Sequence, residues 1–172
     1  MAQIAANPWT FTNADQATTA AITSIANNGD SILITTTAAH GIVQDQKFSI
    51  QGTSGTSNYN GLYRAIAVPT TTTILAFNRL QNRPNVAGGA VGNVLSVAYA
   101  GGSIRAEQIF WQPSAASQQL TITDVYGNTV WAPTASSAAP FGPFTYGKIF
   151  WIANGLVINS LPSTGTLQIT VN

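Results

Sequence analysis

The chain has 172 residues, a formal net charge of +1 and charged side chains at only 6% of its positions, against about 25% in an average soluble domain. Six basic and five acidic side chains argue against the basic patch that electrostatic binding of nucleic acid requires. The chain has no cysteine, which excludes disulfides and thiolate metal sites.

The low charge also bears on the class of protein. Thr, Ser, Ala, Asn and Gln stand where charges usually sit, and a freely diffusing protein of this composition would risk self-association. This favours a subunit whose surface is covered by neighbours. No apolar run reaches the roughly 18 residues of a membrane helix, and MAQIAANPWTF lacks the parts of a secretory signal. We therefore expect no membrane partner and synthesis in the cytoplasm.

The first half of the chain consists of short β-branched and aromatic runs separated by Gly, Asn and Pro, a pattern typical of an all-β fold. Strands are expected at residues 21–24, 31–36, 47–50, 61–68, 72–77 and 90–98. Asn27-Asn28-Gly29 predicts a hairpin turn, because Asn and Gly tolerate positive φ. Pro69 predicts a break, and residues 81–89 predict a loop.

The second half continues the same pattern. Strands are expected at residues 103–111, 119–124, 129–132, 147–152, 156–160 and 166–171. Tyr126-Gly127-Asn128 and Asn154-Gly155 predict tight turns, and residues 133–143 predict a long loop. We predict two small β-sandwich or barrel-like domains, residues 19–100 and 101–172, after an extended N-terminal arm, residues 1–18.

The predicted arm carries two aromatic residues, Trp9 and Phe11, which must be buried somewhere. One hypothesis is that the arm packs on a neighbouring subunit. The other is that it folds back on its own domain.

His40 is the single histidine of the chain, beside Gly41. A Ser-His-Asp triad would have to use it, but the sequence has no G-x-S-x-G nucleophile elbow. A hydrolytic metal site needs several converging ligands. The favoured interpretation is a turn between strands, in which the imidazole bonds to nearby backbone.

Other catalytic patterns are equally weak. The five carboxylates stand apart in sequence, so nothing signals the pair that glycoside hydrolysis uses. They are Asp15, Asp30, Asp45, Glu107 and Asp124. No phosphate-binding loop and no complete calcium loop is present. We expect a protein that is not an enzyme and holds no cofactor or metal.

Aromatic residues recur in the second half, twice as the run IFW. They are typical of a core or a subunit interface, although a carbohydrate-binding platform stays open as an alternative. Together with the arm they give the candidate partner contacts: Trp9, Phe11, Trp111, Trp131, Phe141, Phe144 and Trp151.

Residues 22–77 contain "HGI", "DQKFSIQGT", "NYNGLYRAIAV" and "TTTTILAF" in this order. The series resembles a small β module common in virion proteins of tailed bacteriophages. That module has a His-Gly turn, a strand of the form GD-x-V-x-I-x-G, an N-G-x-Y-x-V strand and a last strand ending in an aromatic residue. Gln44 stands where the module usually has Gly before Asp45.

Residues 103–171 contain "SIRAEQIFW", "LTITDVYGNTVW" and "NGLVINSLPSTGTLQITV", and are similar to a second β domain of phage virion proteins. The two resemblances imply a structural virion protein, a capsid decoration (cement) or minor head protein that binds the major capsid protein. By analogy with cement proteins a cyclic homotrimer is preferred. A tail or head–tail connector component is the nearest variant, and a carbohydrate-binding virion module is the alternative from another class.

Overall fold

The computed structural model describes residues 8–54, 58–78, 80, 83–87, 92–101, 103–137, 141–152, 155–162 and 164–171, and for residues 141–152 it describes the backbone alone. The described chain is all-β, as predicted. It divides into two compact units. We call residues 18–97 with 125–127 the barrel unit, and residues 1–17, 98–124 and 128–172 the sandwich unit.

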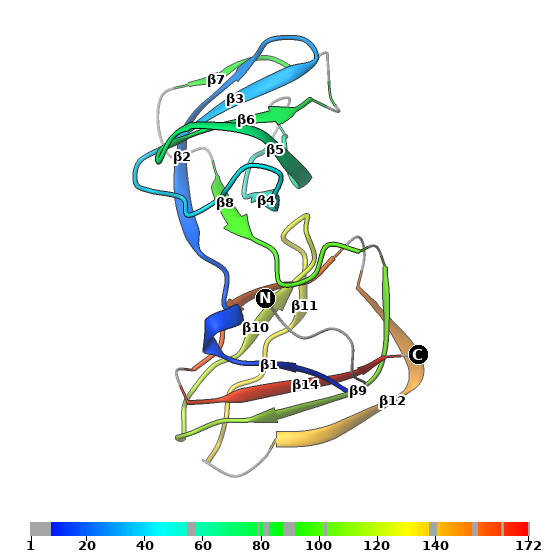
Figure 1. Cartoon of the computed structure of the whole chain (residues 1–172). Helices are drawn as coiled ribbons and strands as arrows, with labels where there is room; N and C mark the ends of the chain where they lie inside the picture. The colour runs from blue at the N-terminus through cyan, green and yellow to red at the C-terminus, as the bar shows by residue number, and fades with distance from the viewer. Residues whose placement is uncertain are drawn as a thin grey trace. The chain divides into compact units, whose positions relative to one another are not determined.

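The described part of the barrel unit contains seven antiparallel strands. They are β2 (Thr19–Asn27), β3 (Ser31–Thr36), β4 (Lys47–Gln51), β5 (Gly61–Thr70), β6 (Thr73–Phe77), β7 (Val86–Ala87) and β8 (Asn93–Ser96). Their order is β3-β6-β5-β4-β8-β2-β7, and a further pairing between β2 and β3 closes the first six of these strands into a barrel (Figure 1). The first part of β2 pairs with β8 and its later part with β3, so one long strand closes the ring.

The barrel closes around apolar side chains that alternate along each strand. In β3, for example, Ile32 and Ile34 are fully buried while their neighbours are partly exposed, as the two-residue period of a strand requires. The core also contains an aromatic pair, Phe48 and Tyr63, whose ring centroids lie 5.9 Å apart. These residues face each other across β4 and β5. The alternation that predicted the strands therefore also defines the interior.

Tyr59, just before β5, makes the stability of the barrel unit depend on pH. Its side chain is fully buried and its hydroxyl donates to the Pro84 carbonyl at 3.1 Å. Burial raises the pKa of the Tyr59 phenol above its ordinary value of 10.0. The unfolded chain therefore loses this proton at a lower pH than the folded chain does. The stabilising contribution is complete below about pH 10 and is lost as the pH rises through the folded pKa.

We therefore expect Tyr59→Phe to flatten the fall in the free energy of unfolding above about pH 10. Urea unfolding at a series of alkaline pH values measures this slope. Tyr126→Phe, at a tyrosine that is 42% exposed, is the matched control. An unchanged slope in Tyr59→Phe would show that this phenol does not govern alkaline stability.

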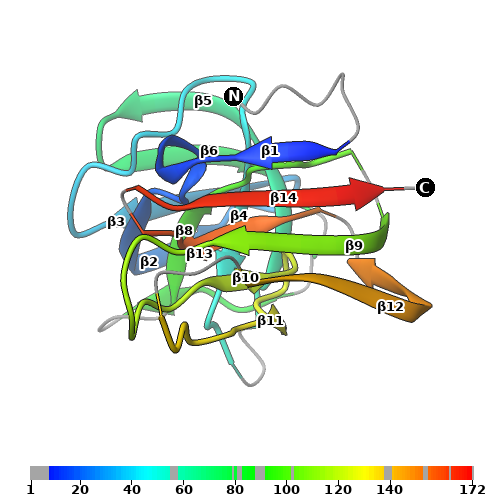
Figure 2. The same ribbon diagram turned by 90° about the horizontal axis from the view of Figure 1, so that it is seen from below.

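Among its described residues, the sandwich unit contains two antiparallel sheets. The first has the order β1 (Trp9–Phe11), β14 (Thr166–Val171), β9 (Ile104–Gln112) and β12 (Phe141–Ile152) (Figure 2). The second has the order β11 (Thr129–Trp131), β10 (Thr121–Thr123) and β13 (Val157–Ser160). A short 3-10 helix, η1 (Asn13–Asp15), follows β1. Buried side chains of both sheets form one core.

The predicted arm folds back on its own chain, the second of the two hypotheses. Its described part supplies β1, in which Trp9 pairs with Ile169 and Phe11 pairs with Leu167. Phe11 is fully buried and Trp9 is 8% exposed. The sequence missed this strand because three residues are too few for a period to be visible. The boundaries between the two units lie between residues 17 and 18 and between residues 97 and 98. From the sequence they were predicted between residues 18 and 19 and between residues 100 and 101.

Several strand limits differ from the expected ones. β5 continues through Pro69, where a break was predicted. The pairing of β5 with β6 shifts register between Ala67 and Thr70, and such an irregularity tolerates a residue without an N–H. β12 begins at Phe141, inside the predicted loop 133–143. Of the predicted Asn154-Gly155 turn, residue 154 lies outside the described residues.

Candidate binding groove on the barrel

His40 forms the predicted turn. The Ile42 backbone N–H donates to His40 Nδ1 at 3.0 Å, and the His40 backbone N–H donates to the Thr71 carbonyl at 3.1 Å. The side chain is only 2% exposed. Gly41 has a φ of +67°, a left-handed conformation that glycine adopts readily. The imidazole thus accepts a hydrogen bond that stabilises the turn preceding β4.

We expect His40→Ala to lower the free energy of unfolding of the barrel unit by about 1–3 kcal/mol, because the buried Ile42 N–H loses its acceptor. His40→Asn should lose less, since an Asn side chain also accepts from the N–H two residues on. Chemical denaturation followed by circular dichroism measures both. Equal stability of wild type and His40→Ala would contradict this role for the imidazole.

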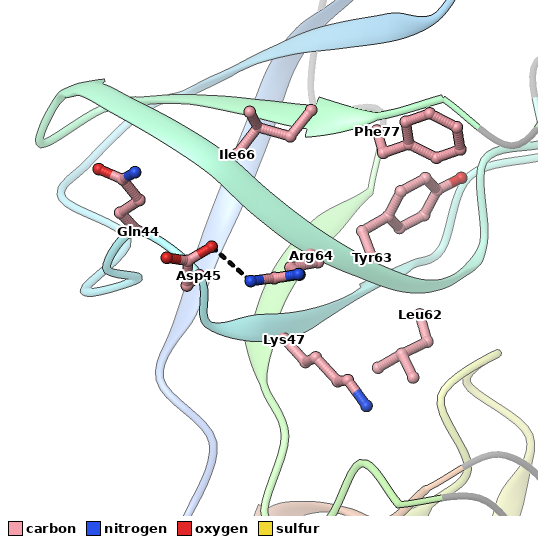
Figure 3. Close-up of a pocket in the computed structure, with 8 residues that line it drawn as sticks. All are labelled: Gln44, Asp45, Lys47, Leu62, Tyr63, Arg64, Ile66 and Phe77. Carbon is pink, nitrogen blue, oxygen red and sulfur yellow. Dashed lines mark hydrogen bonds and ion pairs between the residues drawn. The ribbon is translucent and has the colours of Figure 1, made fainter.

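The described part of the barrel unit carries a groove of about 610 Å³. Its lining is Gln44, Asp45, Lys47, Leu62, Tyr63, Arg64, Ile66 and Phe77 (Figure 3). These residues come from the turn before β4 and from the adjacent strands β4, β5 and β6. In β5, Leu62, Arg64 and Ile66 are partly or largely exposed, while the residues between them are buried. The groove is therefore on the outer face of the barrel.

Strand register brings charged and apolar side chains together in the groove. Lys47 of β4 pairs with Arg64 of β5. Ala65 pairs with Ala76 of β6, which places Arg64 beside Phe77. The register shifts between Ala65 and Ala67, so the intervening Ile66 has the position of a bulged residue. Bulges often re-aim a side chain next to a functional surface.

An ion pair forms one wall of the groove. Arg64 Nη2 donates to Asp45 Oδ1 at 2.7 Å, with the two side chains 64% and 62% exposed. In Figure 3 the Asp45 carboxylate faces the Arg64 guanidinium, with Ile66 to one side and Lys47 to the other. A pair this exposed contributes at most about 1 kcal/mol to stability. Its chief effect is to favour one direction of the guanidinium, toward Asp45.

The turn that carries Asp45 is held firmly against β5. Asp45 has a φ of +67°, a conformation uncommon outside glycine but accessible to Asp. Its backbone N–H donates to the Ala65 carbonyl at 2.9 Å, and the Ala65 N–H donates to the Gln46 carbonyl at 3.0 Å. The positive φ thus falls on Asp45, directly after Gln44.

Exposed apolar side chains gather around the same groove. Phe77 is 56% exposed and Ile66 is 42% exposed, and both line it. Among the described residues two further large apolar side chains are exposed, Val43 at 63% and Tyr126 at 42%, and neither lines the groove. The exposed apolar surface of the groove is thus formed by Ile66 and Phe77.

The partner contacts predicted from sequence lie elsewhere. Trp9, Phe11 and Trp111 are buried in the sandwich core, and Trp131 is half-buried against it. They offer little surface to a partner, because their strands bury them against the opposite sheet. The side chains of Phe141, Phe144 and Trp151 lie outside the described residues. The groove residues were missed because they come together only through strand pairing, although alternation along β5 does indicate that Arg64 and Ile66 face outward.

Comparison of the chain with protein-family models, with curated proteins and with solved structures finds no match. Among the described residues, no three His, Cys, Asp or Glu side chains form a group that could hold a metal ion. The described residues also include no helix of sufficient length and apolarity to span a membrane. The groove itself combines two cations, one carboxylate and exposed apolar side chains, a set suited to binding.

Proposed function

We propose that this protein is a structural subunit of a tailed-phage virion, without enzymatic activity, that binds the major capsid protein and decorates or stabilises the head. The observation that carries the proposal is the clustering of exposed apolar side chains on the barrel of a chain with so few charges. Exposed apolar patches of this kind mark interaction sites. A protein with so few charged side chains is poorly soluble on its own. A surface covered by neighbouring subunits therefore agrees with the composition.

Two further features support the virion class. Residues 22–77 and 103–171 resemble β modules of phage virion proteins, and the first resemblance includes both the His40 turn and the strands that line the groove. A tail or head–tail connector subunit would use the same kind of surface. The carbohydrate-binding alternative needs exposed tryptophans, and it is not favoured by Trp131, which packs against the sandwich core.

The proposal is tested on particles of the virus whose genome encodes the chain. Mass spectrometry of purified particles should detect the protein at many copies per head. Heads prepared without this gene should bind the purified full chain to saturation. Absence from particles, together with no binding to such heads, would overturn the proposal. Sedimentation velocity of the free protein tests the proposed homotrimer, which a stable monomer at all concentrations would contradict.

A further inference from the structure

We infer that the groove of β4, β5 and β6 binds an extended segment of the major capsid protein in which a carboxylate side chain and an apolar side chain are two residues apart. The inference rests on the proposed function and deepens it, since it assigns the contact surface and the chemistry of the partner segment. Three features of the groove carry it: its charge, its spacing and its rigidity.

The charge of the groove favours an anionic group. Lys47 and Arg64 occupy directly opposed positions on β4 and β5, an arrangement of like charges that is unfavourable in itself. Asp45 is the single carboxylate among the residues that line the groove. Two of the six basic residues of the whole chain are thus concentrated here, against one acid. The residues that line the groove therefore have a net charge of +1, which favours an anionic group of the partner.

The spacing favours a polypeptide in extended conformation. Ile66 follows Arg64 by two residues and, like Arg64, is exposed on β5, a separation of at most about 6.6 Å because the bulge at Ile66 bends the strand. Phe77 lies beside Arg64 on the neighbouring strand β6 and lines the same groove. An extended partner segment repeats its side chains at the same interval of about 6.6 Å. A carboxylate near Lys47 and Arg64 therefore places the residue two positions along near Ile66, while Phe77 lies beside Arg64 and offers an apolar contact at that level.

The rigidity of the wall lowers the cost of binding. The backbone hydrogen bonds between the Asp45 turn and Ala65 fix the turn, and the ion pair orients Arg64 before a partner arrives. Preorganised groups lose less entropy on association. Nucleic acid fits the groove less well, because backbone recognition needs a series of cations and the Asp45 carboxylate repels phosphate. The apolar half of the groove would also stay uncovered.

The inference is tested with heads prepared without this gene and the purified full chain. Lys47→Gln removes one cation and leaves the Asp45–Arg64 pair in place, so we expect about tenfold weaker binding. Phe77→Ser should weaken binding by a similar factor or more. Asp45→Asn removes the groove's own negative charge, but its amide oxygen can still accept from Arg64 and the residue tolerates the positive φ, so it should tighten binding several-fold. Circular dichroism and urea unfolding confirm that each variant is folded.

Two control variants match these changes outside the groove lining. Ala116→Asp alters the net charge by the same amount as Lys47→Gln, at an exposed residue of the sandwich unit. Val43→Ser removes an apolar side chain that is 63% exposed but does not line the groove. Both should bind the heads like wild type. Added salt should weaken wild type more than Lys47→Gln, since the variant has lost part of the electrostatic attraction.

The outcomes separate the two levels of the proposal. If wild type fails to bind heads, the proposed function fails. If wild type binds but Lys47→Gln and Phe77→Ser bind equally well, the head contact lies elsewhere and the groove inference is wrong. If Asp45→Asn weakens binding while Lys47→Gln strengthens it, the bound segment is cationic, which also overturns the inference. Short overlapping peptides of the capsid protein, probed with the full chain, should give bound segments that lose binding when their acid is changed to its amide.

Discussion

Replacing Phe11 by alanine is expected to lower the free energy of unfolding of the sandwich unit by about 3–5 kcal/mol, the usual loss for a large buried aromatic side chain. Phe11 is fully buried in the sandwich core and pairs with Leu167 of β14. All four tryptophans belong to the sandwich unit. Their fluorescence therefore follows the unfolding of this unit separately from the barrel unit, which makes it the measurement of choice.

Thr10→Ala is the matched control, because Thr10 lies in the same strand but is exposed. It should shift the fluorescence transition little. The competing hypothesis, an arm docked on a neighbouring subunit, predicts the opposite behaviour of Phe11→Ala. The sandwich transition would then stay unchanged at low protein concentration while the oligomer dissociated. That result would contradict the assignment of β1 to this core.

Gly92→Ala is expected to destabilise the barrel unit by about 3 kcal/mol or more, because backbone strain and overpacking add at this position. Gly92 has a φ of +121°, and a Cβ there would lie 2.6 Å from the Gln51 carbonyl oxygen and 2.9 Å from Thr53 Cγ2. Its own carbonyl accepts from the Ile22 N–H at 2.8 Å. Gly92 thus directly precedes β8, the strand that pairs with both β4 and β2.

Gly29→Ala supplies the comparison for this prediction. Gly29 also has a positive φ, +80°, but a Cβ there would meet nothing within 4 Å. Its substitution should lower stability by only about 1 kcal/mol, the cost of the left-handed conformation alone. Far-UV circular dichroism, read beside the tryptophan signal, follows the barrel transition. If the two alanine variants were equally stable, β8 would not pack against β4 as closely as described.

Local features of the barrel unit could be predicted from sequence because their cause is local. The Asn27-Asn28-Gly29 turn joins β2 and β3 as expected, and Gly29 has the positive φ that the turn requires. The turn at His40 was predicted for the same reason, since it depends on a side chain and a backbone N–H two residues apart. Alternating apolar residues likewise placed β4 and β14 correctly to within a residue.

Long-range pairing set the limit of the sequence prediction. The ion pair of the groove joins Asp45 to a residue 19 positions along the chain, and no local pattern states which strands become neighbours. The sequence could not predict that β2 closes the barrel by pairing with β3, for the same reason. The aromatic residues of the sandwich unit did not mark a partner surface, because Trp111 and Phe11 are buried in its core. Burial there depends on a second sheet whose position no spacing of residues reveals.

A reconstruction of the assembled virus particle would show whether the chain lies on the head and which of its faces contacts the capsid. From the proposed function we expect density for the barrel and sandwich units on the head, with the face formed by β4, β5 and β6 against the major capsid protein and a carboxylate of that protein near Lys47 and Arg64. A particle without this chain, or one in which Ile66 and Phe77 face solvent, would contradict this expectation.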